Sequence, residues 1–249
     1  MRLDFLTLFP EMFSVLDSSI FGRAVSLGIF ETNIIDIRSF SKDKHKKCDD
    51  YPFGGGAGML MSPQPVVDAV RSVKDASAHV IYLSPQGKVL TQQKVVELSK
   101  MEHLVFLCGH YEGIDQRAID LVVDEEISIG DYVLTGGELP AMVLADAVVR
   151  YIPKVLDEQA TVEESFVSGL LEAPQYTRPQ VFEGISVPEI LVNGNHEKIA
   201  EWKIEQGKLQ TKNKRPDLLG EIKWKSIGFR GTWQKPLEWW KKKQKLLMQ

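Results

Sequence analysis

Residues 104–140, LVFLCGHYEGIDQRAIDLVVDEEISIGDYVLTGGELP, decide the fold of this chain. The stretch opens with five apolar residues that are typical of a buried strand, and Gly109 ends the run. Residues 114–121 are predicted to form a short helix, and a second strand is predicted near Ile127. The glycine-rich polar loop that follows leads into a helix at Leu139, where Pro140 fits because first-turn N–H groups have no partner within the helix. In α/β folds, glycine-broken strand ends of this kind are where a small ligand binds.

Strands and helices alternate on the amino-terminal side of this stretch. Strands are predicted at residues 2–9, 32–37 and 79–83, and helices at residues 11–16, 20–27, 63–73 and 91–100. The third strand is expected to end abruptly at residues 84–87, Ser-Pro-Gln-Gly, and a further helix is expected over residues 139–151. Alternating strands and helices with short turns predict an α/β fold with a mostly parallel sheet covered by helices.

A lysine-rich segment and a glycine-rich segment interrupt this alternation. Residues 39–50 are polar and are expected to form an exposed loop, and residues 52–59, PFGGGAGM, carry four glycines in five positions. Such a segment either lets a ligand approach the backbone closely or is simply a flexible loop. It does not match G-x-G-x-x-G, and no G-x-x-x-x-G-K-[ST] occurs in the chain, so it is not a known phosphate-binding motif.

Composition narrows the class of protein. The chain has 249 residues and 43% hydrophobic content, which predicts a soluble globular protein of one large or two modest domains. No apolar run reaches the roughly 18–20 residues that a membrane span needs, and no secretory signal is recognised at the N-terminus. The two cysteines, Cys48 and Cys108, lack metal-ligand spacing, so we expect reduced thiols in a cytoplasmic protein.

Charge is distributed unevenly along the chain. Residues 1–197 carry 16 Lys and Arg against 29 Asp and Glu, whereas residues 198–249 carry 14 against 5 and contain all five tryptophans. A basic, aromatic-rich end on an acidic body suggests a polyanion partner such as RNA, and a solvated helical face with tryptophan in a core is the alternative. We predict a first domain at residues 1–160, a linker or lid at 161–172, and a smaller, mainly helical and basic domain at 173–249.

Five motifs, in order along the chain, carry a resemblance to a known family. They are PFGGG at 52–56, YLSPQG at 82–87, CGHYEG at 108–113, residues 128–140 and PQYTRP at 174–179. From Leu6 to about Gly220 the sequence closely resembles the bacterial tRNA (guanine-N1)-methyltransferases of the SPOUT class. The resemblance implies a C-terminal trefoil knot in the α/β domain, which periodicity could not reveal because threaded chains are so rare. It also implies a homodimer with active sites at the interface, and methylation of N1 of the guanosine just 3′ of the tRNA anticodon.

The resemblance further implies which residues bind the ligands. S-adenosylmethionine would be bound in a bent shape within the knot, with magnesium suggested as an aid to catalysis. The implied cofactor contacts are Tyr82, Leu83, Ser84, Pro85, Gln86, Gly109, Tyr111, Glu112, Gly113, Ile129, Gly130, Asp131, Tyr132, Val133, Leu134, Gly136 and Gly137. The implied RNA contacts are Gly55, Ser165 and Arg178. Each glycine taken alone is equally typical of a turn, but their joint occurrence favours a binding function.

The acceptor atom requires two catalytic roles. Guanine N1 carries a proton, so its attack needs a general base, and negative charge develops towards O6, where a cation would stabilise it. By resemblance the cation is Arg150 and the base is Glu164, which stands where the family has Asp before a Ser-Phe pair. Glu is one methylene longer than Asp, and two alternatives stay open. One is a related SPOUT enzyme that methylates another nucleotide or a ribose, and the other is a cofactor-binding RNA-interaction protein that has lost catalysis.

Overall fold

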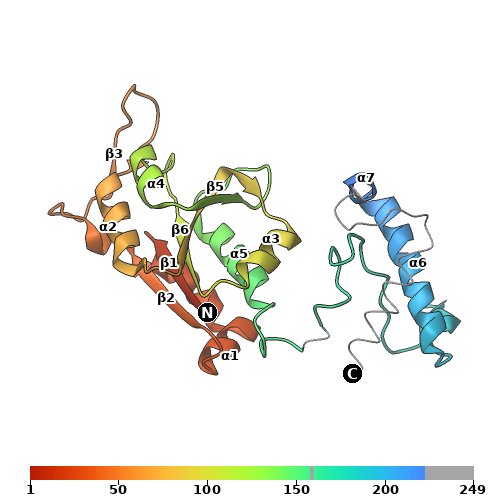
Figure 1. Cartoon of the computed structure of the whole chain (residues 1–249). Coiled ribbons are helices and arrows are strands. Elements are labelled where there is room, and N and C mark those ends of the chain that lie inside the picture. Colours follow the sequence, from red (N-terminus) through yellow and green to blue (C-terminus); the bar gives the residue numbers. More distant parts are fainter. Residues whose placement is uncertain (158–159, 222–249) are drawn as a thin grey trace. The chain divides into compact units, whose positions relative to one another are not determined.

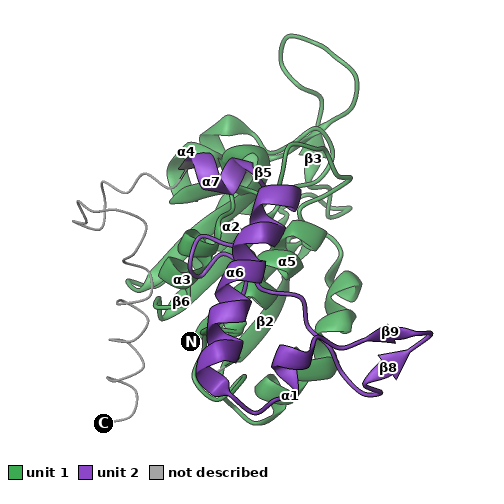
Figure 2. Ribbon diagram, turned by 90° about the vertical axis from the view of Figure 1, so that its right-hand side faces the viewer, with its two compact units in different colours: residues 1–162 green, residues 163–249 purple. Residues whose placement is uncertain are grey.

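The structure, a computed structural model, describes residues 1–157 and 160–221 (Figure 1). The chain divides into two compact units, residues 1–162 and residues 163–249 (Figure 2), and each is described by itself. Of the five tryptophans, only Trp202 is among the described residues; the other four lie outside them.

Unit 1 is built on a five-stranded sheet. Its strands, in spatial order, are β2 (Glu31–Asp36), β1 (Arg2–Thr7), β6 (His103–Cys108), β5 (Ala78–Val89) and β7 (Glu125–Ser128). All neighbouring pairs are parallel, which confirms the predicted sheet. Every residue of β6 is buried, as its uninterrupted apolar sequence predicts for a central parallel strand.

Helices cover both faces of this sheet and form two separate cores. One core holds side chains of η1 (Pro10–Asp17), α1 (Ser19–Ser26), α3 (Gln92–Leu98) and α5 (Glu138–Val149). The other holds side chains of η2 (Ile37–Phe40), α2 (Pro63–Val73) and α4 (Gln116–Val122). Successive strand residues point to opposite faces, so Phe106 packs in the first core and Leu107 in the second.

Three predictions about unit 1 need correction. The third strand does not end at residues 84–87: β5 continues to Val89, with Leu83 and Lys88 both paired to Ile127, so the four residues between them form a bulge. Among the described strands, β7 lies at the edge of the sheet next to β5, and β5 resumes its pairing with β7 after the bulge. The segment at residues 11–16 is a 3-10 helix. The loop at residues 39–50 is not exposed throughout, because Cys48 joins the second core.

Unit 2 contains a short hairpin, β8 (Val181–Phe182) with β9 (Ile185–Ser186), then η3 (Glu189–Leu191), α6 (His196–Lys214) and α7 (Asp217–Glu221). The sequence pattern predicts a helix over about residues 196–206, and helix α6 runs eight residues further. It passes through Gly207, where a Cβ would lie 2.8 Å from the Leu171 carbonyl oxygen, so glycine here permits a close chain crossing. No helix in the described part of the chain is long and apolar enough to cross a membrane.

Candidate cofactor and catalytic site

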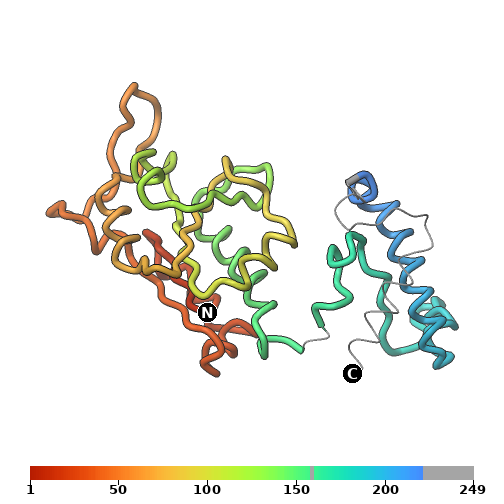
Figure 3. The backbone as a smooth tube through the Cα atoms, in the orientation of Figure 1, coloured from red at the N-terminus to blue at the C-terminus, as the bar shows by residue number. Residues whose placement is uncertain are grey.

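Three of the predicted site segments lie at the carboxyl ends of neighbouring strands of the sheet. Strands β6, β5 and β7 are neighbours and parallel. Leu83 of β5 pairs with Cys108 at the end of β6 and with Ile127 near the end of β7, so the 84–87 bulge lies level with the loops that leave the carboxyl ends of β6 and β7. In open α/β sheets this edge is where ligands bind. The tube in Figure 3 shows these segments, yellow to green, gathered on one side of unit 1.

Backbone hydrogen bonds join the loops after β6 and β7 to each other, and they join the loop after β6 to the glycine loop, which we define as residues 51–59. The Gly137 N–H donates to the Gly109 carbonyl at 2.8 Å, which ties the 129–137 loop to the end of β6. The Glu112 N–H donates to the Met59 carbonyl at 3.0 Å, and the Met61 N–H to the Gly113 carbonyl at 2.9 Å. Three segments far apart in sequence, residues 59–61, 109–113 and 129–137, therefore form one framework.

The glycines at these junctions are required by close packing of the loops. A Cβ on Gly137 would lie 2.8 Å from both the Cys108 Cα and the Gly109 nitrogen, and a Cβ on Gly109 would lie 2.8 Å from the Tyr82 ring. Close approach of a ligand to the backbone had been the expected reason. The structure adds a second reason, because these glycines already face protein atoms.

Tyr82 lies at the centre of the framework. Its side chain is buried against Gly109, and a Cβ on Gly113 would lie 3.7 Å from its hydroxyl oxygen. Burial, with a smaller contribution from the Glu126 charge, raises the pKa of Tyr82 to about 12, although a hydrogen bond to the Ile114 backbone opposes the shift. The phenol is therefore neutral at physiological pH.

The 129–137 loop combines a fixed start with an exposed middle. The Ser128 hydroxyl donates to the Gly130 carbonyl at 2.9 Å and accepts from the Gly130 N–H at 3.2 Å, which holds the first turn. Tyr132 and Val133 follow, with 55% and 82% of their surfaces exposed. Of the predicted contacts in this loop, Asp131 to Leu134 are exposed, whereas Ile129, Gly130 and Gly136 are half-buried and Gly137 is buried.

A buried carboxylate behind this loop was missed in the sequence. Glu138 opens α5 and is 1% exposed, and its Oε1 accepts a hydrogen bond from the hydroxyl of the fully buried Thr7 at 2.8 Å. Its Oε2 and the His110 Nδ1 both lie against Gly136, within the space that a Cβ there would need. The His110 Nδ1 is buried and has no hydrogen-bond partner among the residues that the structure describes. Only the acidic residue directly after Gly137 could have drawn attention to this cluster.

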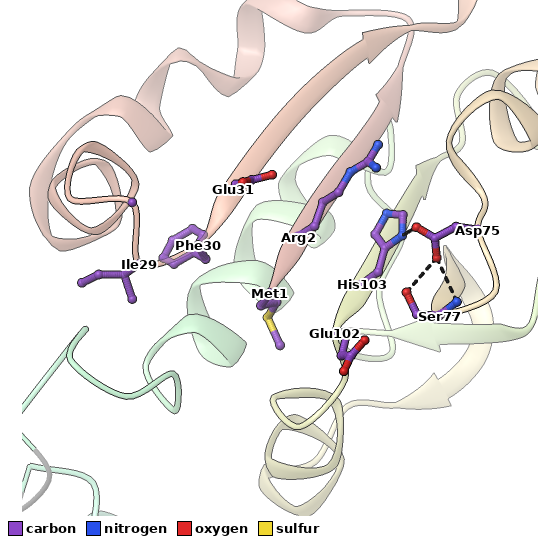
Figure 4. A pocket seen from close by; sticks show the side chains of 10 residues that line it. Met1, Arg2, Ile29, Phe30, Glu31, Asp75, Ser77, Glu102 and His103 are labelled. Atoms are coloured by element: carbon purple, nitrogen blue, oxygen red, sulfur yellow. Dashed lines mark hydrogen bonds and ion pairs between the residues drawn. The ribbon is translucent and has the colours of Figure 1, made fainter.

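A polar pocket lies at the other end of the strands (Figure 4). Arg2, Glu31 and His103 line it from the first residues of β1, β2 and β6, together with Asp75. None of the predicted site residues lines this pocket.

The predicted catalytic residues belong to different units. Arg150 is the C-cap residue of α5 in unit 1, so it lies at the end of that helix as predicted. Its side chain is half-buried. Glu164 is half-buried in unit 2. Its neighbour Glu163 forms an ion pair with Lys203 at 3.0 Å. The pairing of Arg150 with Glu164 across one substrate stays a prediction.

The predicted RNA contacts occupy three separate segments. The Ser165 hydroxyl accepts from the Glu172 N–H at 3.1 Å, Arg178 is exposed, and Gly55 lies in the glycine loop with φ +78°. Both cysteines are buried and free. Among the residues that the structure describes, no group of three or more His, Cys, Asp or Glu side chains could hold a metal ion.

Comparison with known proteins identifies the family. Residues 1–221 match the family model described as tRNA (Guanine-1)-methyltransferase TrmD. The chain belongs to this family. The match includes all the predicted site residues, from Gly55 to Arg178.

Individual relatives support the same assignment. A tRNA (guanine-N(1)-)-methyltransferase of Ruminiclostridium cellulolyticum is 56% identical over 232 residues, which cover 91% of this chain and 100% of the relative. The protein of the same name from Caldanaerobacter subterraneus subsp. tengcongensis is 58% identical over 222 residues, covering 88% and 92%. That of Clostridioides difficile is 55% identical over 224 residues, covering 88% and 97%. The chain is thus similar to these enzymes over nearly their whole length.

Proposed function

We propose that this enzyme transfers a methyl group from S-adenosylmethionine to N1 of the guanosine just 3′ of the tRNA anticodon. The observation that carries the proposal is the framework of glycine-broken loops at the carboxyl edge of a parallel sheet, in a chain that belongs to the tRNA (guanine-1)-methyltransferase family. No feature of these residues favours a related enzyme with a different nucleotide specificity.

The residues of the framework fit S-adenosylmethionine. Backbone groups of the 84–87 bulge, of Gly109 to Gly113 and of the 129–137 loop would hold its adenosine and methionine parts, since glycine lets a ligand come close to the chain. The His110 Nδ1 is a buried polar atom in need of a partner at the same place. The bound cofactor supplies an electrophilic methyl group on a positively charged sulfur. Glu112, beside Gly58, is the carboxylate suited to lie near that charge.

Glu164 and Arg150 would act on the guanine. The Glu164 carboxylate would take the proton from N1 as that atom attacks the methyl group, so that the lone pair becomes available. Arg150, at the end of the helix that begins beside Gly137, would lie near O6 and stabilise its developing negative charge. Ser165 and Arg178 would hold the RNA around these groups.

We infer a trefoil knot at the carboxyl edge of the sheet. Strand β7 lies at the edge beyond β5, yet Gly137, nine residues after Ser128, bonds to the end of β6. The chain therefore passes the end of β5 on its way to α5, which is the kind of crossing that a knot requires.

We infer a homodimer that shares its active sites. Helix α5 and the loop before it leave large apolar side chains exposed on unit 1: Tyr132, Val133, Leu134, Leu139 and Val143. Apolar side chains gathered on two adjoining segments favour a protein interface, and a second copy would cover them next to the cofactor loops.

Unit 2, which includes the basic residues 198–249, is assigned to tRNA binding. Residues 198–249 carry a net charge of +9, from 14 Lys and Arg against 5 Asp and Glu. Cations of this density bind phosphate with strong salt dependence. A tRNA substrate places the enzyme in the cytoplasm, and assistance by magnesium stays a prediction of the family resemblance.

The test of the mechanism is Glu164→Gln in a single-turnover assay with saturating S-adenosylmethionine and tRNA. The amide keeps the shape and removes proton-accepting capacity, so we expect methyl transfer to fall by about 10²- to 10⁴-fold. Calorimetry should find both ligands bound as in the parent. An ordinary single-turnover rate would show that Glu164 is not the base.

A further inference from the structure

The segment that carries Glu164 and Ser165 crosses helix α6. We call residues 163–172 the Glu164 segment; it falls within the predicted linker or lid, and it belongs with α6 to unit 2 (Figure 2, purple). Among the described residues of unit 2, only Gly207 and Thr211 are buried, and both lie on α6. Both of them contact the Glu164 segment, so the best-buried place in this part of the chain is the crossing.

Gly207 lets the Glu164 segment lie directly against the backbone of the helix. A Cβ at this position would lie 2.8 Å from the Leu171 carbonyl oxygen, which is closer than a Cβ approaches another atom in a protein. Glycine inside a helix weakens the helix relative to alanine. Its presence inside α6 therefore has a reason in packing, and that reason is the passage of the chain at Leu171.

Thr211 fixes the crossing chain one helical turn further along. Its side chain has no exposed surface, although threonine is mostly found at protein surfaces. The Thr211 hydroxyl donates to the Gly207 carbonyl at 2.7 Å and accepts from the Leu171 N–H at 2.9 Å. Since a buried group that loses its hydrogen-bond partner is costly, this hydroxyl holds Leu171 in one position.

One face of α6 holds the Glu164 segment along its length. The residues of this face recur at intervals of four, which places them on the same side of the helix: Lys203, Gly207, Thr211 and Arg215. The first of them pairs with the Glu163 carboxylate at 3.0 Å. The guanidinium of the last, the C-cap residue, lies over the Phe166 ring at 6.0 Å from its centroid. The segment is thus contacted near its start, at Phe166 and near its end.

Hydrogen bonds inside the segment extend this hold to Glu164 and Ser165. The Glu172 N–H, which follows the Leu171 held by α6, donates to the Ser165 hydroxyl at 3.1 Å. The Val167 N–H donates to the Glu164 carbonyl at 3.3 Å. The backbone at the predicted base is therefore linked to the helix through a short series of hydrogen bonds.

The residue after Ser165 has an unusual backbone conformation. Phe166 has φ +75°, which is uncommon for a residue other than glycine. Its N–H donates to the Leu170 carbonyl at 2.8 Å, and its carbonyl accepts from the Gly169 N–H at 3.1 Å. Such conformations persist only where the surrounding structure fixes them, and they cluster at functional sites.

We propose that Thr211 and Gly207 are positioning residues for methyl transfer, which seat the Glu164 segment on α6 so that the Glu164 carboxylate is held where it can take the N1 proton. The proposal rests on the function proposed above, in which Glu164 is the base. It gives α6 a role in the chemical step, in addition to the tRNA binding assigned to unit 2. Position matters at this step, because displacing a catalytic group by about 1 Å can cost about 10²-fold in rate.

The alternative is that the crossing only stabilises unit 2. Stability comes mainly from buried apolar side chains, whereas the buried residues here are a glycine and a threonine. The crossing also lies beside the predicted catalytic residues, because Leu171, which Thr211 holds, is followed by the residue whose N–H holds Ser165. Both features favour a role in positioning.

The first test removes the hydroxyl in the full-length protein and keeps the shape of the side chain. With Thr211→Val, we expect the single-turnover rate at saturating S-adenosylmethionine and tRNA to fall by about 10- to 10²-fold. Thr211→Ser keeps the hydroxyl and should restore the rate. Cofactor affinity and helix content, measured by calorimetry and circular dichroism, should equal the parent's in both variants. Equal rates for the valine variant and the parent would overturn the proposal.

The second test separates positioning from stability. If Thr211 acts through Glu164, then adding Thr211→Val to Glu164→Gln should change the residual rate by no more than about twofold, because the base is already absent. A structural role would slow the parent and Glu164→Gln by the same factor, which would overturn the proposal and leave Glu164 as the base. An ordinary rate for Glu164→Gln alone would refute the base and this proposal with it. Failure of the parent to methylate guanosine N1 would instead refute the proposed function.

The third test changes the crossing without touching the Thr211 hydroxyl. In Gly207→Ala the helix is not weakened, since alanine forms helices more readily than glycine, but the new Cβ would push the Leu171 carbonyl away. We expect a loss of rate similar to that of Thr211→Val. The matched control is Gly220→Ala in α7, where a Cβ would meet nothing within 4 Å, so its rate should equal the parent's. A parental rate for Gly207→Ala as well would overturn the proposal.

Discussion

Replacing Thr7 with valine tests whether the buried Glu138 carboxylate holds the cofactor framework in place. Valine has the shape of threonine and lacks its hydroxyl, so the 2.8 Å hydrogen bond to the Glu138 Oε1 is lost. The Thr7 Oγ1 also accepts from the Phe9 N–H at 2.9 Å, and that bond is lost as well. Since Thr7 and Glu138 are 0% and 1% exposed, water cannot replace the missing donor without disturbing the core.

The expected effect follows from that burial. A buried acceptor that loses its partner costs about 1–3 kcal/mol, and more when it is charged, so we expect unit 1 to lose at least about 2 kcal/mol of its free energy of unfolding. Affinity for S-adenosylmethionine should fall too, because Glu138 directly follows the loop that Gly137 ties to β6. The rate of methyl transfer at saturating cofactor should change much less than its KM.

The assay has to report on unit 1 alone. Every tryptophan of the chain lies at or beyond residue 202, so tryptophan fluorescence follows the other part of the protein. Amide hydrogen exchange of β1 and α5 is the suitable measurement, together with calorimetric binding of S-adenosylmethionine. Thr7→Ser keeps the hydroxyl and is the matched control. If Thr7→Val and Thr7→Ser have the same exchange rates and the same cofactor affinity, the carboxylate does not support the site.

Three further predictions follow from named contacts. Gly137→Leu should abolish S-adenosylmethionine binding in calorimetry, because its Cβ would overlap the end of β6, whereas Gly220→Leu, in open space, should leave the affinity unchanged. The Arg117 side chain holds the pKa of Asp115 below its usual range, so the stabilisation by this carboxylate is present above about pH 4 and is lost as pH falls through the lowered pKa. Asp115→Asn keeps the helix cap, and the difference in unfolding free energy from the parent should therefore shrink towards acid pH; a constant difference would contradict this. Glu164→Asp should slow single-turnover methyl transfer if the loop has adapted to glutamate, and a rate equal to the parent's would mean that the local geometry is that of the family.

The sheet could be predicted because its signals are local. The buried run at residues 104–108, the Thr91 cap and the glycine after Ser26-Leu27 each specify their own element, and the structure has β6, α3 and α1 there. The bulge at residues 84–87 could not be predicted, because it depends on the edge position of β7. The length of α6 was missed because Gly207 resembles a helix stop until the crossing at Leu171 is known.

The loops of the candidate site could be predicted from the sequence, whereas the buried contact behind them could not. The sequence indicates loops that contain glycine, and because β6, β5 and β7 are parallel neighbours, these loops lie together at the carboxyl ends of the strands. The Thr7–Glu138 bond joins residues 131 positions apart, and no local pattern indicates such a pair. The catalytic roles of Arg150 and Glu164 came from the family resemblance, because a single carboxylate and a single arginine have no spacing that reveals their function.

Methyl transfer to a tRNA transcript tests the central claim most directly. The purified chain would be incubated with methyl-labelled S-adenosylmethionine and a transcript that has guanosine just 3′ of the anticodon, or with a matched transcript that has adenosine there. Nuclease digestion and chromatography of the nucleosides then locate the label. We expect N1-methylguanosine from the first transcript and no labelled nucleoside from the second. Label on a ribose, on another base or on neither transcript would contradict the proposed function.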